Sequence, residues 1–545
     1  MMAETTLLEE RTYANNCEEN LPPCAVQIVK TDDSGHKFIL DETSLEKLLM
    51  NEKVREKYVS VVSVAGAFRK GKSFLLDFFL RYLDAKYKKC DITDWLGPND
   101  IPLEGFCWKG GSERVTAGIL MWSDVYITTT PTGQEAAIIL LDTQGTFDSN
   151  STVCDCATIF ALSTMVSSVQ VYNISQNIQE DDLQHLELFA EYGRLALANC
   201  GRVPFQKLMF LIRDWSFPYE AKYGLEGGRQ LLEKRLKIKP NQHSELQFLR
   251  RHIKSCFSDI NCYLMPHPGL KVATNPYFDG KLIDIEPEFL YYIENLAPLI
   301  LAPENLTLKT VNGQIIKAKE LYLYFKSYTK IFSGNELPEP KSMLVATAEA
   351  NHLAALAAAK ENYVLAMEEY CGGTRPYLKS SVLEQEHNRQ KSLALECFSN
   401  KRKMGSNELT EAYCVQLNND IEQMYLHFKS HNESKNIFKA ARTPAVFMTL
   451  AIVTYVLSNF MALISFNTLA SFCSLITTLA IITLLTWFYT RYSGEYADIS
   501  LLIDTAADRL WENLMKPTYL SMVQNNDDDD VEHPATSRTD KIASS

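Results

Sequence analysis

Predominantly apolar runs alternate with amphipathic stretches over the first half of the chain. Such runs predict strands at 58–65, 119–125, 136–141, 205–212 and 262–265. The segment 24–40 alternates enough to begin the same sheet, and helical patterns close the region at 287–301 and 317–332. We therefore expect an α/β domain over residues 26–333, built on a mixed, mainly parallel sheet.

The pattern becomes wholly helical after a short break. A linker is expected over 334–341, where two prolines interrupt the helical pattern. Three long helical stretches follow it, at 342–370, 382–404 and 409–431. They predict an all-α helical bundle over 342–438. No set of His, Cys or carboxylate residues recurs there at i, i+3 spacing, so we interpret the bundle as mechanical rather than catalytic.

The most apolar part of the chain is 444–490, which contains no Asp, Glu, Lys or Arg. One membrane span needs about 20 apolar residues, so this length predicts two transmembrane helices in a hairpin, with a short turn near 465–467. A helical hairpin buried in a soluble core is the alternative, but no other domain is large enough to enclose it. Lys439 and Arg442 before the hairpin and Arg491 after it predict cytosolic N- and C-termini by the positive-inside rule.

Polar segments lie at both ends of the chain. Residues 1–25 are acidic and lack an apolar run, so we expect a disordered leader and no signal peptide. The cytosolic tail, 491–545, contains an amphipathic helix at 499–515. The apolar side of this helix is formed by Ile499, Leu502, Ile503, Ala506, Leu510 and Leu514. The helix is long enough to lie in a bilayer surface, and packing against a partner helix is the alternative.

Charge and cysteine usage narrow the classes of function. The formal net charge is −13 and no basic stripe dominates, which argues against nucleic acid as the main partner. The 13 cysteines are scattered, mostly within apolar runs, as in reduced cytosolic proteins. Cys154 and Cys156 are the closest pair, but no second pair at zinc spacing accompanies them. We interpret these two residues as free thiols.

The candidate chemistry begins where the strand at 58–65 ends. Gly66-Ala-Phe-Arg-Lys-Gly-Lys-Ser73 is a G-x-x-x-x-G-K-S phosphate loop between a strand and a helix. Its glycines let backbone N–H groups surround a phosphate, and the N-terminus of the following helix adds partial positive charge. Lys72 can reach the β- and γ-phosphates, and the Ser73 hydroxyl can hold Mg²⁺. A glycine-punctuated turn in an unrelated α/β domain is the alternative.

A second phosphate motif follows the strand at 136–141. Asp142-Thr-Gln-Gly145 reads D-x-x-G, which places a carboxylate near Mg²⁺ and a flexible glycine near the γ-phosphate. Thr116 precedes another strand, in the position of a switch threonine that closes onto Mg²⁺ when a γ-phosphate is present. The two motifs together predict a nucleoside triphosphatase.

The residue that assists hydrolysis is not the usual one. Thr146 follows the D-x-x-G glycine, where small GTPases carry a water-orienting glutamine. Arg69, inside the phosphate loop, is the candidate replacement, because an arginine that stabilises the transition state is worth on the order of 10³ to 10⁵ in rate. Alternatively, Arg69 only solvates the loop or pairs with a carboxylate.

The base-reading residues also depart from the common pattern. No N-K-x-D motif occurs, and the strand at 205–212 ends instead in Arg213-Asp214. An aspartate there can accept hydrogen bonds from both N1–H and the exocyclic amine of guanine, a donor pair that adenine lacks. We therefore expect GTP as the substrate. A surface ion pair is the alternative for Arg213 and Asp214. Val272 lies in a later loop that is placed to cover the base.

These motifs, with several further segments, resemble the atlastins. The further segments are 176–183, 213–219, 267–273, 340–343, 346–351 and 491–495, so the resemblance covers most of the chain. Atlastins are dynamin-superfamily GTPases that tether and fuse endoplasmic reticulum membranes. The resemblance implies that Arg69 acts in cis when two GTPase domains pair, that Arg213 and Asp214 contact guanine, and that Thr116 is the switch ligand. One departure is Ala117, where a second threonine is common.

The expected site can be stated as three sets. Catalytic roles are expected for Arg69, Lys72 and Thr116, and Mg²⁺ ligands are expected to be Ser73, Thr116 and Asp142. Nucleotide contacts are expected from Gly66, Phe68, Arg69, Lys70, Gly71, Lys72, Ser73, Phe74, Asp142, Gly145, Arg213, Asp214 and Val272.

Two functions from different classes fit the order of these parts. The first is a mechanoenzyme of the endoplasmic reticulum membrane, multi-pass, that fuses membranes through nucleotide-dependent homodimers in cis and in trans. Its expected partners are itself, the lipid bilayer and other hairpin proteins that shape this membrane, with no nucleic acid. The second is a membrane-shaping hairpin scaffold in which GTP serves only as a regulatory switch.

Overall fold

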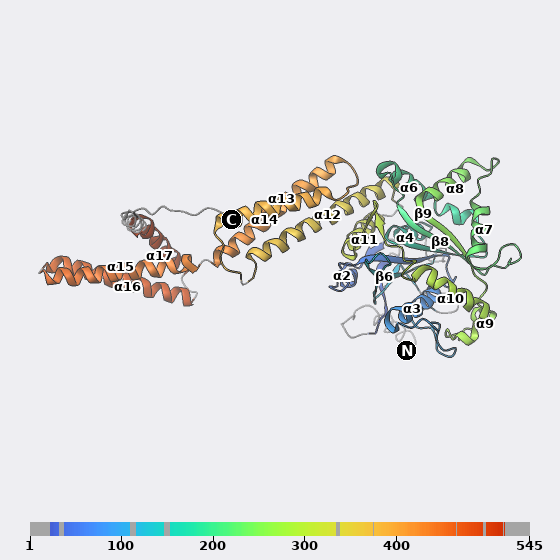
Figure 1. Ribbon diagram of the computed structural model, residues 1–545, viewed down its shortest axis with the longest axis horizontal. Helices are drawn as coiled ribbons and strands as arrows, with labels where there is room; N and C mark the ends of the chain where they lie inside the picture. The colour runs from blue at the N-terminus through green and yellow to red at the C-terminus, as the bar shows by residue number, and fades with distance from the viewer. Residues whose placement is uncertain are drawn as a thin grey trace, which may run out of the picture. The chain divides into compact units, whose positions relative to one another are not determined.

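A computed structural model of the protein (Figure 1) describes residues 22–31, 38–108, 116–145, 153–333, 338–373, 375–435, 437–464, 466–493, 497–515 and 517. The expected leader up to residue 21, residues 334–337 of the expected linker and the tail beyond 517 lie outside the described residues. The chain forms two compact units. One comprises residues 1–363 and 391–421, and the other comprises residues 364–390 and 422–545.

The first unit is organised around a mixed sheet in the order β2-β1-β4-β6-β3-β7-β8-β9, with β5 paired to β6. The strands are β1 (Ala25–Thr31), β2 (Phe38–Leu40), β3 (Tyr58–Gly66), β4 (Ile119–Trp122), β5 (Tyr126–Thr129), β6 (Glu135–Thr143), β7 (Val169–Ser175), β8 (Phe205–Arg213) and β9 (Phe257–Leu264). Strands β6, β3, β7, β8 and β9 run parallel, and the pairings of β1, β2, β4 and β5 are antiparallel. The expectation of a mixed, mainly parallel sheet is confirmed.

Helices cover both faces of this sheet (Figure 1). They are α2 (Glu42–Leu49), α3 (Lys72–Leu83), η1 (Asp84–Lys89), α4 (Val153–Val166), α5 (Glu180–Gln184), α6 (Glu187–Cys200), α7 (Gly224–Leu236), α8 (Ser244–Cys256), α9 (Leu270–Thr274), η2 (Leu282–Asp284), α10 (Pro287–Leu301) and α11 (Ala318–Phe332). Side chains of β3 alternate between two cores: Val62 and Val64 join α3 and α10, and Val59 and Val61 join α4 and α11. This burial on both faces explains why β3 has valines on both of its faces and no charged residue.

Lys309 is a buried cation beside the small hairpin of β10 (Thr310–Val311) and β11 (Gln314–Ile315). Its Nζ donates to the Ser167 carbonyl oxygen at 2.8 Å. Burial lowers the pKa of Lys309 to about 7. An unfolded chain keeps the ordinary lysine pKa of about 10.4, so between these values the unfolded state holds a proton that the folded state has released. The contribution of Lys309 to stability therefore rises with pH across this window.

Replacing Lys309 with methionine tests this linkage. We expect Lys309→Met to melt at a higher temperature than the unchanged protein at pH 7, because it removes the cost of burying a charge. The difference in melting temperature between the variant and the unchanged protein should narrow toward pH 9.5, where the unchanged protein buries a neutral amine. Thermal unfolding of the detergent-solubilised chain at both pH values measures it, and a difference that does not change with pH contradicts the assignment.

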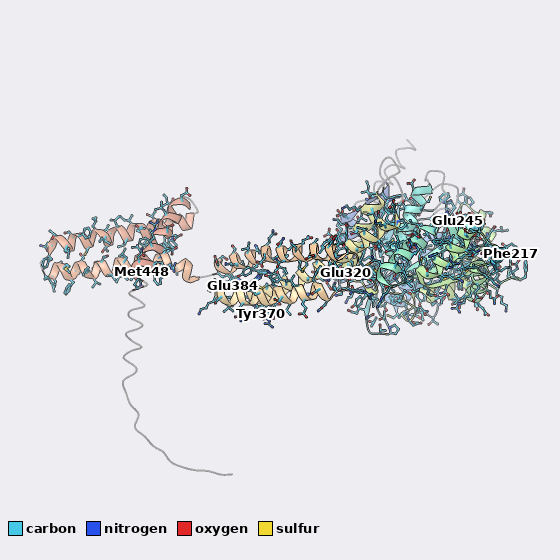
Figure 2. All side chains as sticks on the ribbon, turned by 90° about the horizontal axis from the view of Figure 1, so that it is seen from above. Phe217, Glu245, Glu320, Tyr370, Glu384 and Met448 are labelled. Atoms are coloured by element: carbon cyan, nitrogen blue, oxygen red, sulfur yellow. The ribbon has the colours of Figure 1, made fainter. Side chains whose placement is uncertain are left out.

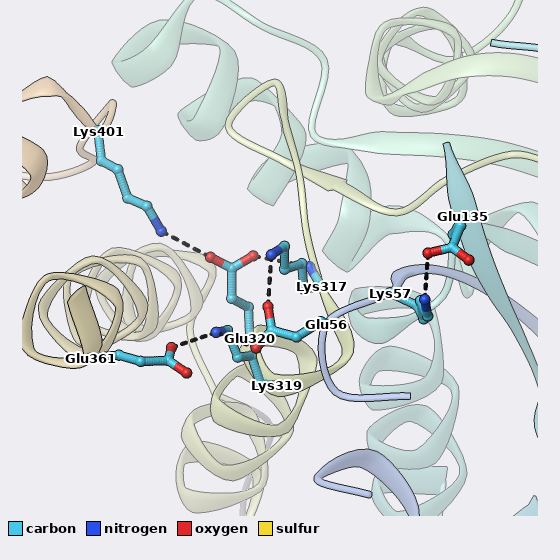
Figure 3. A network of polar contacts seen from close by, with 8 residues as sticks. All are labelled: Glu56, Lys57, Glu135, Lys317, Lys319, Glu320, Glu361 and Lys401. Atoms are coloured by element: carbon cyan, nitrogen blue, oxygen red, sulfur yellow. Dashed lines mark hydrogen bonds and ion pairs between the residues drawn. The ribbon is translucent and has the colours of Figure 1, made fainter. Parts of the chain in front are cut away.

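Ion pairs surround the start of α11, as Figure 3 shows. The pairs are Lys317–Glu56, Lys319–Glu56, Lys319–Glu361 and Lys401–Glu320, at 2.6–3.0 Å. Glu56 precedes β3, Glu361 lies on α12 (Pro340–Cys371), and Lys401 follows α13 (Ser380–Asn400). Each partly exposed pair is worth at most about 1 kcal/mol. Together they connect α11 to the sheet and to the parts of the helical region that belong to this unit.

The helical region has the three long helices that the pattern predicted, with α14 (Asn407–Ser434) as the third. Two further helices, α15 (Ile437–Leu463) and α16 (Asn467–Ser493), contain apolar stretches at Ala441–Leu463 and Asn467–Thr490 that are long enough to cross a membrane. Most of their large apolar side chains are exposed, as at Met448, which is 54% exposed (Figure 2). Exposed apolar surface of this extent suits contact with lipid rather than the core of a soluble domain.

The tail helix α17 (Ala497–Leu510), followed by η3 (Trp511–Met515), packs against both apolar helices. Ile503, Ala507 and Leu510 contribute to this contact, whereas Leu502 is 73% exposed. The apolar side expected from the sequence is therefore divided: Ile503 and Leu510 pack on the apolar helices, the alternative left open above, and Leu502 is exposed. The Asp504 carboxylate accepts hydrogen bonds from Thr443 Oγ1 at 2.6 Å and from Trp487 Nε1 at 2.8 Å.

Candidate functional site

The phosphate-loop segment connects the C-terminal end of β3 to the first turn of α3. Gly66 has a φ of +142°, and a Cβ added there would lie 2.0 Å from the Asn173 carbonyl oxygen of β7, so only glycine fits. Lys72 folds back over the loop, and its Nζ donates to the carbonyl oxygens of Gly66 at 3.3 Å and Ala67 at 3.2 Å. Arg69 has a φ of +62°, which turns the loop at its centre. The lysine and the N-terminus of α3 thus lie at the same edge of the sheet.

Three oxygen-bearing side chains meet beside the start of α3. Asp142 is the penultimate residue of β6, which runs parallel to β3, so its carboxylate reaches the same edge as Ser73. Ser73 Oγ donates to Asp142 Oδ2 at 2.6 Å, and Thr116 Oγ1 donates to the same oxygen at 3.2 Å. The two hydroxyl oxygens are 3.5 Å apart. The three residues expected to hold a metal are therefore adjacent, although they come from different parts of the chain.

The electrostatics of Asp142 are consistent with a cation site. Burial raises the pKa of Asp142, and the charge of Lys72 with the hydrogen bonds from Ser73 and Thr116 opposes that shift. Its other oxygen, Oδ1, is buried and has no hydrogen-bond partner among the described residues. Carboxylate and hydroxyl oxygens are the ligand types that Mg²⁺ prefers. The side chains present thus fit a magnesium ion.

A cavity of about 410 Å³ opens along this edge. Its lining includes twelve of the expected nucleotide-binding and metal-binding residues: Phe68, Arg69, Lys70, Gly71, Lys72, Ser73, Phe74, Thr116, Gly145, Arg213, Asp214 and Val272. Gly66 and Asp142 do not line the cavity, but both contact residues that do. The structure therefore brings together residues that are far apart in the sequence.

The sequence reasoning missed several residues of this cavity. Its remaining lining residues are Cys107, Trp108, His267, Pro268, Ala273, Asn275 and Phe278. Trp108 packs against Phe74 and Phe278, with ring centroids 5.2 and 5.6 Å away. The available signal was weak: Trp108 is an aromatic residue in a long loop, and Phe278 follows the segment that contains Val272.

Arg213 and Asp214 occupy different places in the site. Arg213 is only 4% exposed, and its Nη1 donates to the carbonyl oxygens of Lys70 and Gly71, both at 3.4 Å. Burial lowers the pKa of Arg213, and the neighbouring charge of Asp214 opposes this shift. Arg213 therefore braces the phosphate loop, a contact that the sequence did not indicate. Asp214 has a φ of +59° and lines the cavity.

Arg69 is another cationic residue at the same cavity. Its guanidinium is 5.7 Å from the centre of the Phe68 ring, and both residues line the cavity. Gly145 also lines it, so the D-x-x-G motif and the phosphate loop share one wall. The lining combines the cations of the phosphate loop with the carboxylate of Asp214, so it suits a ligand that carries both anionic groups and hydrogen-bond donors.

Comparisons with known proteins agree with the geometry. The family model for the N-terminal domain of guanylate-binding proteins matches residues 35–310. The chain is 58% identical to Atlastin of Drosophila melanogaster over 516 residues, which is 95% of this chain and 94% of that protein. It is 53% identical to Atlastin-2 of Homo sapiens over 518 residues, covering 95% and 88% of the two chains. It is also 53% identical to Atlastin-1 of Bos taurus over 508 residues, covering 92% and 90%.

Proposed function

Because this chain belongs to the atlastin family, it is a dynamin-superfamily GTPase of membrane fusion, and we propose that it acts by pairing two copies across opposing membranes. GTP loading would pair the GTPase domains, and hydrolysis would move the helical bundles so that the membrane hairpins approach. The observation that carries this proposal is the order of parts on one chain: nucleotide site, long helices, two apolar helices and a tail helix.

The proposed division of the chain follows from the same order. The GTPase domain is assigned to residues 26–333, the linker to 334–341 and the helical-bundle domain to 342–438. Residues 444–490 are assigned to the transmembrane hairpin and 491–545 to the cytosolic tail. We place the protein in the endoplasmic reticulum membrane because its relatives are atlastins. We place both termini in the cytosol because basic residues flank the hairpin on both sides.

Residue roles in the proposed reaction follow from charge and position. Lys72 would neutralise the β- and γ-phosphates, and backbone N–H groups of the phosphate loop would hold the β-phosphate. Ser73, Thr116 and Asp142 would hold Mg²⁺, which supplies charge neutralisation at the phosphates when bound. Two observations support this set of ligands. Ser73 Oγ lies 2.6 Å from Asp142 Oδ2, and Asp142 Oδ1 has no hydrogen-bond partner among the described residues.

Arg69 and Asp214 would supply the transition-state charge and the base specificity. Arg69 lines the cavity with the phosphate-loop residues, so its guanidinium can reach a γ-phosphate when the loop is ordered by a second GTPase domain. Asp214 lines the same cavity beside Val272. An ionised aspartate there offers two acceptor oxygens to the two donors on the guanine edge.

The experiment for the fusion proposal uses the full chain in two populations of liposomes, one of which carries a quenched pair of lipid dyes. With GTP and Mg²⁺, lipid mixing should rise with protein density, and GDP should give none. Normal GTP hydrolysis without lipid mixing at any protein density would falsify the fusion proposal. The same result would favour the membrane-shaping scaffold, which needs GTP only for assembly.

Asp504 provides a separate prediction about the tail helix. Its carboxylate accepts from one residue on each apolar helix, and a hydrogen bond to a charged group is worth about 1.5–3 kcal/mol. Asp504→Ala should therefore loosen α17, with backbone amides of α17 exchanging at least about tenfold faster in liposomes. Asp498→Ala, at an exposed position in the first turn of the same helix, is the matched control. Equal exchange in both variants would show that Asp504 does not hold the helix.

A further inference from the structure

We propose that Asp77, on the second turn of α3, is a positioning residue for GTP binding that fixes Trp108 as a wall of the nucleotide cavity. The inference extends the proposed GTPase function, on which it rests. Asp77 does not line the cavity, and no phosphate or metal role applies to it. Asp77 acts through the two N–H groups that donate hydrogen bonds to its carboxylate oxygens.

The Asp77 side chain is fully buried and accepts one hydrogen bond at each oxygen. The Phe106 backbone N–H donates to Oδ1 at 2.7 Å, and the Trp108 indole Nε1–H donates to Oδ2 at 2.7 Å. Burial raises the pKa of Asp77, and the two donated hydrogen bonds oppose that shift because they stabilise the ionised carboxylate. A buried carboxylate is costly unless it is hydrogen-bonded, so these two donors are what make the position tolerable.

The backbone approaches Asp77 so closely that the contact must be built into the fold. Gly105 has a φ of +156°, and a Cβ added there would lie 2.4 Å from Asp77 Oδ1. One turn later, Arg81 donates to the carbonyl oxygens of Leu96, Ile101 and Pro102 at 2.6–2.9 Å. Helix α3 therefore anchors the loop that follows it in the chain at two points, and Asp77 is the anchor next to the cavity.

Trp108 carries the effect of this anchor to the nucleotide site. Its ring packs edge-to-face on Phe74, in the first turn of α3, and lies 5.6 Å from the ring of Phe278. All three aromatic residues line the cavity. Trp108 thus joins the phosphate-loop side of the cavity to the loop after β9. Releasing the indole from Asp77 would leave the wall without a fixed position.

Asp77→Asn breaks this arrangement with almost no change of volume. An asparagine has one acceptor oxygen and one amide donor, so one of the two N–H groups must face another N–H. We expect about tenfold weaker binding of a fluorescent, non-hydrolysable GTP analogue to the full-length variant, with a matching rise in the KM for GTP. The kcat at saturating GTP should change less than about twofold, because no group that touches the reacting atoms is altered.

Trp108→Phe gives the second arm of the experiment, since it keeps an aromatic ring but removes the indole donor. Alone it should weaken binding by about three- to tenfold. Combined with Asp77→Asn it should be no worse than the weaker-binding single variant, because the asparagine amide no longer faces an indole N–H. Gly105→Ala, which drives a Cβ into Asp77 Oδ1, should reproduce the rise in KM from the other side of the contact.

Asp84→Asn is the matched control, because Asp84 immediately follows α3 and accepts from the Tyr126 hydroxyl at 2.7 Å. It should leave analogue binding unchanged. Unchanged binding in both Asp77→Asn and Trp108→Phe, or a double variant whose loss equals the product of the two single losses, overturns the proposal. A chain that binds no GTP analogue even without substitution would instead refute the proposed GTPase site.

Discussion

Arg69→Ala is expected to slow GTP hydrolysis by about 10³- to 10⁵-fold, the usual worth of an arginine that stabilises the phosphoryl-transfer transition state. The chain has threonine where small GTPases carry a water-orienting glutamine, so no second side chain from the D-x-x-G motif replaces the loss. Arg69 lines the cavity together with other residues of the phosphate loop, so in the proposed reaction its charge would lie where negative charge develops. GTP binding itself should change little, because Lys72 and the loop backbone remain.

The measurement pairs single-turnover hydrolysis with lipid mixing in liposomes. Arg229→Ala, at an exposed position on α7, is the control and should hydrolyse GTP normally. If Arg69→Ala tethers liposomes with GTP but does not fuse them, hydrolysis drives fusion. If Arg69→Ala still reshapes vesicles as fully as the unchanged protein, the regulatory-switch scaffold is the better explanation. Normal hydrolysis by Arg69→Ala would remove the arginine from the catalytic set.

Asp214→Asn is expected to convert the nucleotide specificity from guanine to xanthine. Two hydrogen bonds to a charged acceptor are worth about 1.5–3 kcal/mol each, so GTP affinity should fall by about 10²- to 10⁴-fold. Xanthine keeps the N1–H donor but carries an oxygen in place of the exocyclic amine. An asparagine oxygen and amide match that donor and acceptor in turn. Xanthosine triphosphate should therefore be bound and hydrolysed by the variant.

The gain of activity is what makes this variant informative. A variant with a misfolded cavity would bind GTP less tightly and would not bind xanthosine triphosphate. Only a direct contact between Asp214 and the base predicts that the preference changes from GTP to xanthosine triphosphate. Asp279→Asn is the matched control, since Asp279 is an exposed carboxylate that pairs with Lys281 at 2.6 Å. Retained preference for GTP in Asp214→Asn would place guanine recognition on another residue.

The parts of the site that could be predicted from the sequence are those whose residues are contiguous. Gly66 to Ser73 and Asp142 to Gly145 are short motifs whose spacing is set by phosphate chemistry, and each follows a strand that the apolar pattern located within a few residues. Parallel pairing of β3 and β6 then brings both motifs to one edge. Local rules were enough for the phosphate end of the cavity.

The aromatic wall could not be predicted in this way, because its members meet only through tertiary packing. Trp108 and Phe278 belong to loops with no periodic pattern, and α3 positions one of them through Asp77. A signal did exist. Asp77 is the one charged residue between Phe74 and Leu80, and a lone carboxylate inside an apolar run needs partners.

The tail helix shows a different limit of sequence patterns. A helical wheel groups Leu502 with Ile503, but it cannot show that α15 and α16 present a polar contact for Asp504. The surface of α15 and α16 therefore decides which side of α17 is buried, and a helical wheel of α17 alone contains no information about that surface. The exposed Leu502 remains available to a bilayer, while Ile503 packs on the hairpin.

The most direct test asks whether the GTPase domains of two copies pair only when a γ-phosphate, or a mimic of it, is bound. The full chain is placed in lipid nanodiscs at one copy per disc, and the mass of the particles is measured with GDP and with GDP plus aluminium fluoride, which mimics the transferring phosphate. We predict single discs with GDP and paired discs with the mimic. Discs that stay single with both nucleotides, or pair equally with both, contradict nucleotide-driven pairing.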